Sequence, residues 1–426
     1  GQSNIISGGT GATLVGGFDN RIHLRNGLSG DTNNQAFLGG GYLNRIINGS
    51  DQAALVGGQN NIISGASRAS IVGGYDNGIT ASSYSFVGGG LLNKIYSRET
   101  SPGIANFIGA GQDNTITGNS LSFLGGGYLN RIINVAGTLG YNVLVGGNKS
   151  GISGATRAFI GGGEFNSISG TVGSVIVGGK RNRVVTPYGG NYTSGGIRQE
   201  SDFAVIGGGS INIIQKAAHS SVIGGGRLNL IQNSGDTSVI AGGSGNTIST
   251  DTNATVIGGG IDNLIGSLMN SGTIAGGKQN LITATTINAS TESTIGGGFL
   301  NTIWDSSAAV IAGGDTNKIS ASTTSFIGGG DRNIISGNSQ HSGIGAGQRN
   351  ILGEESRFSF VGGGQDNYLW YYSNHSVLGG GYRNKLWIGS EYSFLGGGYW
   401  NRISSSTHSV LVGGEYNVIS GDTPAR

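Results

Sequence analysis

Hydrophobic and polar residues follow one short pattern that repeats along the whole chain. Each repeat has a small residue, two apolar residues, a Gly, Val or Ala, two glycines, two variable residues and then Asn-x-Ile. One copy runs from Ser85 to Ile95, and another runs from Ser238 to Ile248. Short alternating stretches of β-branched and aromatic residues are typical of strands, and glycines between them are typical of turns. The pattern predicts two short strands per repeat and no helix, because so much glycine disfavours helices.

The Asn of each repeat marks the period most clearly. Its position recurs 24 times, mostly at steps of 16 or 17 residues, and Ser150 replaces Asn once. Asn adopts the left-handed region more readily than most residues, and stacked Asn side chains can form hydrogen-bonded ladders. We therefore predict a structural turn ladder rather than a binding role for these residues. Representative members are Asn61, Asn77, Asn93, Asn130, Asn166, Asn229, Asn246, Asn263, Asn333 and Asn384.

A repeat of this length cannot bury its own apolar side, whereas stacked copies can. We therefore predict an all-β fold, a parallel β-solenoid or β-roll of about 24 coils that spans residues 1–426 as one continuous domain. Coils ~4.8 Å apart would make a rod ~115 Å long. Each coil offers about three inward apolar side chains, for which Phe86, Val87 and Ile95 are typical. Because this core is thin, we expect three chains to pack their glycine-lined edges together as a homotrimer.

Longer steps between the Asn positions mark insertions in the repeat. They lie near residues 23–36, 97–107, 134–143, 184–203 and 283–293. We expect these loops to protrude without interrupting the stack, and loops on a rigid scaffold often carry function.

The two predicted strand motifs, Ser-Φ-Φ-Gly-Gly and Asn-x-Ile-x-Ser-Gly with Φ apolar, also indicate a family. They resemble the head repeats of YadA-like trimeric autotransporter adhesins. The resemblance implies a left-handed parallel β-roll with one coil per repeat in each of three chains, at a cell surface. Repeats of phage tail fibres and of extracellular filaments are similar in style.

Composition narrows the range of functions. The 426 residues carry a formal net charge of +2, only 11% are charged, 88 are glycine and none is cysteine. The absence of Cys excludes disulfides, Cys-ligated metals and a thiol nucleophile. The balanced charge argues against nucleic acid as a partner, and no apolar run reaches the ~20 residues of a membrane helix. We assign no cofactor, no metal site and no catalytic residue, and interpret the histidines as ordinary loop residues: His23, His219, His341, His375 and His408.

Two features remain as candidates for chemistry. Acidic pairs could serve glycoside hydrolysis, and they occur at Glu200 with Asp202 and at Glu354 with Glu355. Aromatic residues are dense in the last third of the chain, and exposed aromatic clusters commonly contact glycans or proteins. The candidate binding surface comprises Tyr368, Trp370, Tyr371, Tyr372, Tyr382, Trp387, Tyr399 and Trp400.

These observations favour an extracellular fibrous structural protein at a cell or virion surface. We expect a rigid trimeric rod or filament that serves attachment or adhesion and is not an enzyme. The expected partners are other copies of the chain and a surface glycan or host-cell receptor. Neither end of the sequence has an obvious cap, which leaves two alternatives: more chain exists outside this sequence, or rods join end to end into a filament. The alternatives are a phage tail fibre or receptor-binding protein and a glycan-degrading, tailspike-like enzyme.

Overall fold

The predicted fold class is confirmed. The computed structural model is all-β and forms a parallel β-solenoid of about 22 turns, with no helix in the part of the chain that it describes. The chain divides into two compact units, Gly1–Ala217 and Ala218–Arg426. The described residues are 1–24, 32–97, 103–118, 121–133, 140–186, 202–215, 218–232, 237–249, 252–285 and 290–421.

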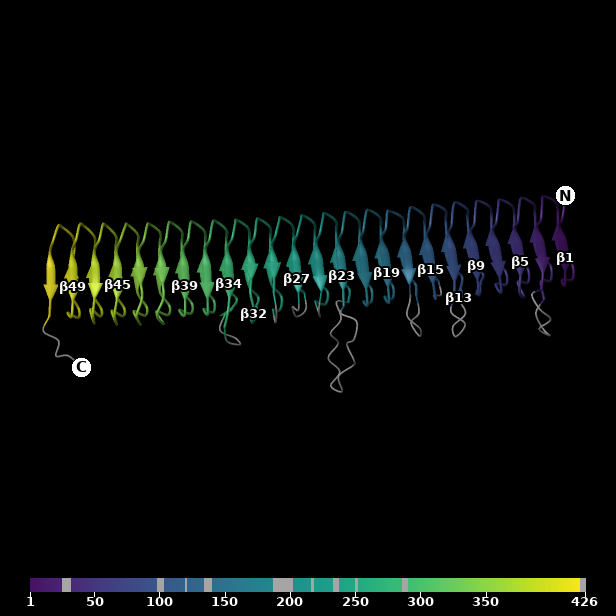
Figure 1. Ribbon diagram of the computed structural model, residues 1–426. Helices are drawn as coiled ribbons and strands as arrows, with labels where there is room; N and C mark the ends of the chain where they lie inside the picture. Colours follow the sequence, from purple (N-terminus) through teal and green to yellow (C-terminus); the bar gives the residue numbers. More distant parts are fainter. Residues whose placement is uncertain are drawn as a thin grey trace, which may run out of the picture. The chain divides into compact units, whose positions relative to one another are not determined.

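Every turn contributes one strand to each of two parallel sheets (Figure 1). Strands of sheet 1 begin directly after the Asn position, and strands of sheet 2 end one residue before the central pair of small residues, which is Gly-Gly in most turns. Equivalent residues of successive turns are paired, so that Ile46 lies opposite Ile63 in sheet 1 and Leu55 lies opposite Ile71 in sheet 2. The sequence repeat therefore becomes a set of rows, in which each repeat position occupies one row along the unit.

In the first unit, sheet 1 consists of β1 (Ile5–Ser7), β3 (Arg21–His23), β5 (Arg45–Ile47), β7 (Ile62–Ser64), β9 (Gly78–Thr80), β12 (Lys94–Tyr96), β15 (Thr115–Thr117), β17 (Arg131–Ile133), β19 (Gly151–Ser153), β21 (Ser167–Ser169), β23 (Arg183–Val185) and β25 (Ile213–Gln215). Sheet 2 consists of β2 (Thr13–Leu14), β4 (Phe37–Leu38), β6 (Ala54–Leu55), β8 (Ser70–Ile71), β11 (Phe86–Val87), β14 (Phe107–Ile108), β16 (Phe123–Leu124), β18 (Val143–Leu144), β20 (Phe159–Ile160), β22 (Val175–Ile176) and β24 (Val205–Ile206). A separate pair joins β10 (Ser82–Ser83) to β13 (Gly103–Ile104).

In the second unit, sheet 1 consists of β27 (Leu230–Gln232), β29 (Thr247–Ile248), β31 (Leu264–Ile265), β34 (Leu281–Thr283), β37 (Thr302–Trp304), β39 (Lys318–Ser320), β41 (Ile334–Ile335), β43 (Ile351–Leu352), β45 (Tyr368–Trp370), β47 (Lys385–Trp387), β49 (Arg402–Ser404) and β51 (Val418–Ser420). Sheet 2 consists of β26 (Val222–Ile223), β28 (Val239–Ile240), β30 (Val256–Ile257), β33 (Thr273–Ile274), β36 (Thr294–Ile295), β38 (Val310–Ile311), β40 (Phe326–Ile327), β42 (Gly343–Ile344), β44 (Phe360–Val361), β46 (Val377–Leu378), β48 (Phe394–Leu395) and β50 (Val410–Leu411). A separate pair joins β32 (Met269–Asn270) to β35 (Ser290–Thr291).

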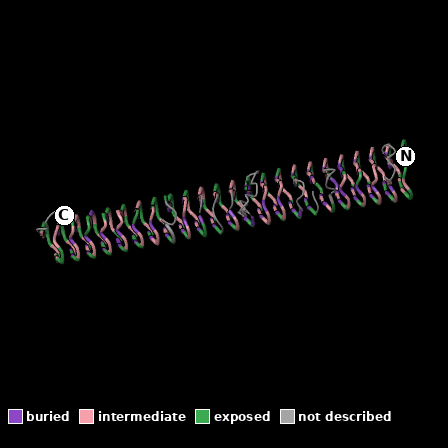
Figure 2. Tube along the Cα trace, turned by 90° about the horizontal axis from the view of Figure 1, so that it is seen from below, coloured by how far each residue is buried: buried purple, intermediate pink, exposed green. Residues whose placement is uncertain are grey.

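The core of each unit is narrow, and buried and exposed residues follow one another closely along the inner turns (Figure 2). A typical turn buries one aliphatic side chain from each strand, as with Val87 in β11 and Ile95 in β12. The prediction that Phe86 also lies in the core was wrong. Phe86 directly precedes Val87 in the same strand, and neighbouring strand residues face opposite sides of a sheet, so Phe86 points outward and is half-buried.

The ten Asn residues named in the sequence analysis are fully buried, and Asn263 shows how such a residue connects three turns. The Asn263 amide donates from Nδ2 to the carbonyl oxygen of Gly259 at 2.9 Å and to that of Gly277, one turn on, at 3.0 Å. Its Oδ1 accepts the backbone N–H of Asn280 at 3.0 Å, while its own backbone N–H donates to Oδ1 of Asn246 at 3.0 Å. All ten Asn residues named in the sequence analysis donate from Nδ2 to a glycine carbonyl four residues earlier and to one in the following turn.

The left-handed backbone conformation lies beside the Asn, not at it. Asp262, which precedes Asn263, has φ 54°, and Gly260 has φ 91°. A Cβ atom on Gly260 would lie 2.6 Å from Nδ2 of Asn263 and would collide with the carbonyl oxygen of Gly277. The third glycine of the repeat is therefore required by its own chain, for both conformation and space.

Serine supplies further ladders in the second unit, at the corners between the two strands. The backbone N–H of Ser376 donates to Oγ of Ser359 at 3.1 Å, and that of Ser393 donates to Oγ of Ser376 at 3.0 Å. Oγ of Ser376 in turn donates to the carbonyl oxygen of Ser390 at 2.8 Å. Ala69 and Ala158 occupy the equivalent buried position in other turns. Small buried residues at the corners thus allow the chain to turn closely around the narrow core.

Parts of the five predicted insertions lie outside the described residues, namely residues 25–31, 98–102, 134–139, 187–201 and 286–289.

We predict that Asn263→Ala will destabilise the second unit by about 3 kcal/mol, because two carbonyl oxygens and one amide N–H lose their buried partners. Asn263→Ser should cost less, since Ser150 at the equivalent position accepts the next backbone N–H through its Oγ at 3.2 Å. Thermal unfolding and hydrogen exchange at the amide of residue 280 measure both effects. Asn253→Ala, at an exposed Asn in the same unit, is the matched control. Equal behaviour of the 253 and 263 variants would contradict the ladder's role.

The two central glycines of one repeat should respond very differently to alanine. Gly260→Ala places a Cβ against Gly277 and Asn263 in a strained backbone conformation, and we expect a loss of about 2 kcal/mol or more. Gly259→Ala places a Cβ in open space, so the free energy of unfolding of a single chain should stay within roughly 0.5 kcal/mol of that of the parent protein. Chemical denaturation followed by circular dichroism provides the comparison. A large loss with Gly259→Ala in a single chain would refute the geometry.

Candidate functional site

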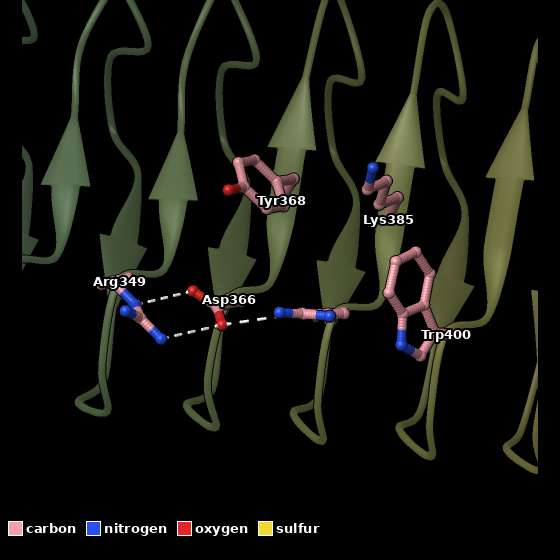
Figure 3. A pocket seen from close by; sticks show the side chains of 6 residues that line it. Arg349, Asp366, Tyr368, Lys385 and Trp400 are labelled. Carbon is pink, nitrogen blue, oxygen red and sulfur yellow. Dashed lines mark hydrogen bonds and ion pairs between the residues drawn. The ribbon is translucent and has the colours of Figure 1, made fainter.

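A hollow of about 320 Å³ lies on sheet 1 of the second unit (Figure 3). Four successive turns contribute the residue that precedes the ladder Asn, and two turns contribute the residue that follows it. Those two, Tyr368 of β45 and Lys385 of β47, stand side by side on adjacent strands (Figure 3). The full lining is Arg349, Asp366, Tyr368, Arg383, Lys385 and Trp400.

Asp366 lies between two arginines. Nε of Arg349 is 2.8 Å from Oδ1 of Asp366, and Nη2 of Arg349 donates to Oδ2 at 3.0 Å, which makes a bidentate pair. Nε of Arg383 lies 3.8 Å from Oδ2 of the same carboxylate. The Asp366 side chain is 12% exposed, whereas Arg349 and Arg383 are 45% and 43% exposed. The carboxylate therefore holds one guanidinium firmly and faces the second at longer range.

Aromatic rings lie against the other two cations, Arg383 and Lys385. The Arg383 guanidinium lies 4.8 Å from the Tyr382 ring centre and 5.1 Å from that of Trp400. Nζ of Lys385 lies 5.5 Å from the Tyr368 ring centre and 5.8 Å from that of Trp387. Cation–π contacts of this kind position a cation without neutralising its charge. Three cations and one carboxylate line the hollow, which is consequently positive.

The structure divides the predicted aromatic surface into two groups. Trp370, Tyr371 and Trp387 lie at the ends of β45 and β47, with ring centres 6.0 Å apart for Trp370–Tyr371 and 5.5 Å apart for Tyr371–Trp387. A second group lies in the segments before the strands, where Tyr382 stacks on Tyr399 at 5.4 Å and Tyr399 meets Trp400 edge-on at 6.4 Å.

Two further members of the predicted surface lie apart from these ring contacts. Tyr368 lies on sheet 1, where it meets Lys385, and Tyr372 is exposed at the corner of its turn. Of the eight aromatic residues, Tyr368 and Trp400 line the hollow itself.

A continuous stack of rings follows another row of the second unit. His341, Phe358, His375, Tyr392 and His408 occupy the same corner position in five successive turns. Their ring centres are 4.9, 5.0, 4.8 and 5.0 Å apart, and adjacent planes differ by no more than 12°. Phe358 and Tyr392 are about half exposed. Three of the five histidines thus belong to one ordered element, which the interpretation as separate loop residues did not anticipate.

The outer face of sheet 2 has an unusual composition. In every described strand of this sheet, the outward residue is Val, Phe, Thr, Ala, Ser or Gly, and in none is it charged. Several of these side chains are exposed, including Phe123, Phe326 and Phe394. The outward positions of sheet 1, in contrast, include Arg45, Lys94 and other charged residues. The two faces of each unit therefore differ sharply in polarity.

Of the acidic candidates, Asp202, Glu354 and Glu355 lie in the described part of the chain. Asp202 is buried, and its Oδ1 accepts the backbone N–H of Val172 at 2.7 Å, which is a structural role. Glu200 lies outside the described residues. Glu354 and Glu355 are adjacent residues in left-handed conformation at one corner. In the described part of the chain, no three His, Cys, Asp or Glu side chains are grouped as metal ligands would be, and no helix has the length and hydropathy of a membrane span.

The charged half of the hollow was not predicted, although the sequence contains a signal for it. Arg349, Asp366 and Arg383 recur at steps of 17 residues, and each directly precedes a ladder Asn. The ring stack shows the same step from His341 to Tyr392. Aligning the repeats on Asn and comparing each position between neighbouring turns would have brought both sets of residues together.

No family model matches the sequence, and no curated protein matches it.

Proposed function

We propose that this chain is an extracellular fibrous protein, which associates with copies of itself into a rigid rod or filament that serves attachment at a cell or virion surface. The observation that carries the proposal is the uncharged outer face of sheet 2. The repeat style supports it independently, because it resembles YadA-like adhesin heads, in which three chains form a left-handed β-roll. A homotrimer is the assembly that we propose.

The sheet 2 face of each unit is a continuous uncharged strip. Its two-residue strands rise about 7 Å and its turns lie about 4.8 Å apart, so the 12 sheet 2 strands of the second unit present roughly 400 Å². Monomeric proteins rarely expose contiguous apolar patches of more than a few hundred Å². Without a covering partner, this face would promote unspecific aggregation.

The repetition of the face favours a second copy of the chain as its partner. Its rows of Val, Phe and small residues advance by one turn at a time in each unit. A partner must have the same axial spacing to pack against such rows along their length, and an identical chain has it by construction. Three copies in parallel would bring three such faces to a common axis.

The second glycine of the repeat supports close approach from outside the chain. Gly259 does not have positive φ, and a Cβ added to it would meet no atom within 4 Å. In this turn its own chain therefore does not require glycine, whereas the equivalent Gly89 and Gly329 have φ of 145° and 153° and are restricted by their own backbone. Ala110 and Ala346 occupy the position in two turns, and no larger residue occurs there. A neighbouring backbone packed against this row would explain the restriction in turns where the chain itself leaves space, as at Gly259.

A phage tail fibre or receptor-binding protein remains the second candidate, because the same assembly would serve it. We do not propose a catalytic role. The hollow contains one carboxylate, Asp366, whereas glycoside hydrolysis ordinarily requires two.

Light scattering coupled to size exclusion tests the assembly, and we expect a mass of three times 43.0 kDa. Val239→Lys combined with Val256→Lys places two charges on the sheet 2 face and should release single chains, because buried unpaired charges are costly. The matched control is Thr247→Lys, in β29 on the opposite face. Lysine occurs at the equivalent position as Lys94 and Lys318, so the control should keep the parent mass.

A parent protein of 43.0 kDa that stays soluble as single chains would overturn the proposed self-association. Loss of assembly with Thr247→Lys alone would place the interface on sheet 1. A mass of two chains would keep the sheet 2 interface and replace the trimer with a face-to-face pair.

A further inference from the structure

We propose that the hollow on sheet 1 of the second unit binds an acidic saccharide, that is, a sugar that carries a carboxylate or sulfate group. The inference deepens the attachment role proposed above and rests on it. It concerns a different face from the proposed interface, since Tyr368 and Lys385 are outward residues of sheet 1.

The net positive charge of the hollow favours binding of an anion. The bidentate contact with Asp366 largely satisfies Arg349, and the second contact of that carboxylate, to Arg383, is 3.8 Å long. Among the described residues, no carboxylate lies within ion-pair distance of Lys385. An anionic group placed between Arg383 and Lys385 would supply the counter-charge that the protein does not. Guanidinium groups are weakly hydrated and match planar or tetrahedral oxyanions well.

The cations are also held in position before any ligand arrives. Tyr382 and Trp400 lie against the Arg383 guanidinium, and Tyr368 and Trp387 lie against the Lys385 ammonium. Their side chains therefore lose less conformational freedom on binding than free surface cations would. The strands β45 and β47 that carry Tyr368 and Lys385 are paired in register, which fixes the width of the hollow.

The walls of the hollow indicate a saccharide rather than a bare anion. Tyr368 and Trp400 contribute aromatic surface beside the cations. Asp366 contributes carboxylate oxygens that can accept hydrogen bonds from hydroxyl groups. A ligand with an anionic group, hydroxyls and apolar C–H faces matches all three features. A volume of about 320 Å³ is at the small end of ligand sites and suits a sugar unit at the end or edge of a glycan.

Titration calorimetry with the full chain tests the proposal. The probes are sialyllactose, which carries a carboxylate, a sulfated heparin tetrasaccharide, neutral lactose, inorganic phosphate and a single-stranded oligonucleotide. We expect one or both acidic saccharides to bind, with at least tenfold weaker binding of lactose and phosphate. Affinity should fall as salt is raised, because the hollow is open to solvent and its charges are screened.

Paired variants locate the site. Lys385→Gln and Arg383→Gln should each reduce the affinity at least tenfold. The matched control is Lys318→Gln, which removes the same charge from a lysine whose Nζ lies 5.6 Å from the Trp304 ring centre, away from the hollow. The control should bind like the parent protein. Circular dichroism and the light-scattering mass of each variant show whether fold and assembly are retained.

Each of the other outcomes overturns the proposal in a recognisable way. Equal binding of lactose and sialyllactose would indicate a neutral glycan site, and equal binding of phosphate would indicate a simple anion site. Tighter binding of the oligonucleotide would indicate nucleic acid. Equal loss with Lys318→Gln would indicate unspecific charge attraction. If none of the probes binds, the hollow is not a saccharide site. Because mass is measured on the same samples, failure of binding in an assembled protein is distinct from failure of the proposed assembly.

Discussion

The hydrogen bonds of one buried Asn per turn are the interaction on which the rest of this structure depends. Strands of two or three residues have little stability alone, and the interior of each turn is too narrow for a conventional core. The Asn amide compensates by joining its own turn to the turns before and after it through backbone groups, as Asn263 does with Asn246, Gly277 and Asn280. Each amide that is satisfied in this way also fixes the register of the two adjacent sheet 1 strands. Stability and alignment therefore come from the same contacts.

Fixed register determines how a surface site can form in such a protein. Every repeat position becomes a row, so a site is built from equivalent positions of neighbouring turns rather than from a distinct loop. The hollow arises because Arg349, Asp366 and Arg383 follow one another along the row that precedes the ladder Asn. Opposite charges in adjacent turns lie close enough to pair, as the 2.8 Å contact of Arg349 with Asp366 demonstrates. Changing one variable residue per turn is then sufficient to alter surface chemistry without disturbing the fold.

The sequence predicted the fold class, the period and the Asn positions because these depend on residues that recur in nearly every repeat. It failed where direction within a strand mattered: Phe86 and Val87 are both apolar, and only Val87 points inward. It also assigned the left-handed conformation to Asn, although residues such as Asp262 adopt it and leave the Asn side chain free to bond inward. The charged half of the hollow was not predicted, because its residues are variable and meet only after the turns are stacked. Interactions between neighbouring copies of one variable position are visible in a single sequence only once the register is known.

The two faces of each turn can serve different roles because strand alternation separates their chemistry. Outward residues of sheet 2 are uncharged in every described strand, whereas sheet 1 and the residues just before its strands carry the cations and aromatic rings of the hollow. If copies of the chain cover sheet 2, the burial of that face leaves Tyr368 and Lys385 on the outside of the assembly. Self-association and ligand binding then do not compete for surface, and every chain of the assembly presents its own hollow. Several such hollows on one particle would bind a multivalent glycan surface with much greater avidity than one hollow alone. Weak affinity at a shallow single site is therefore compatible with firm attachment by the assembly.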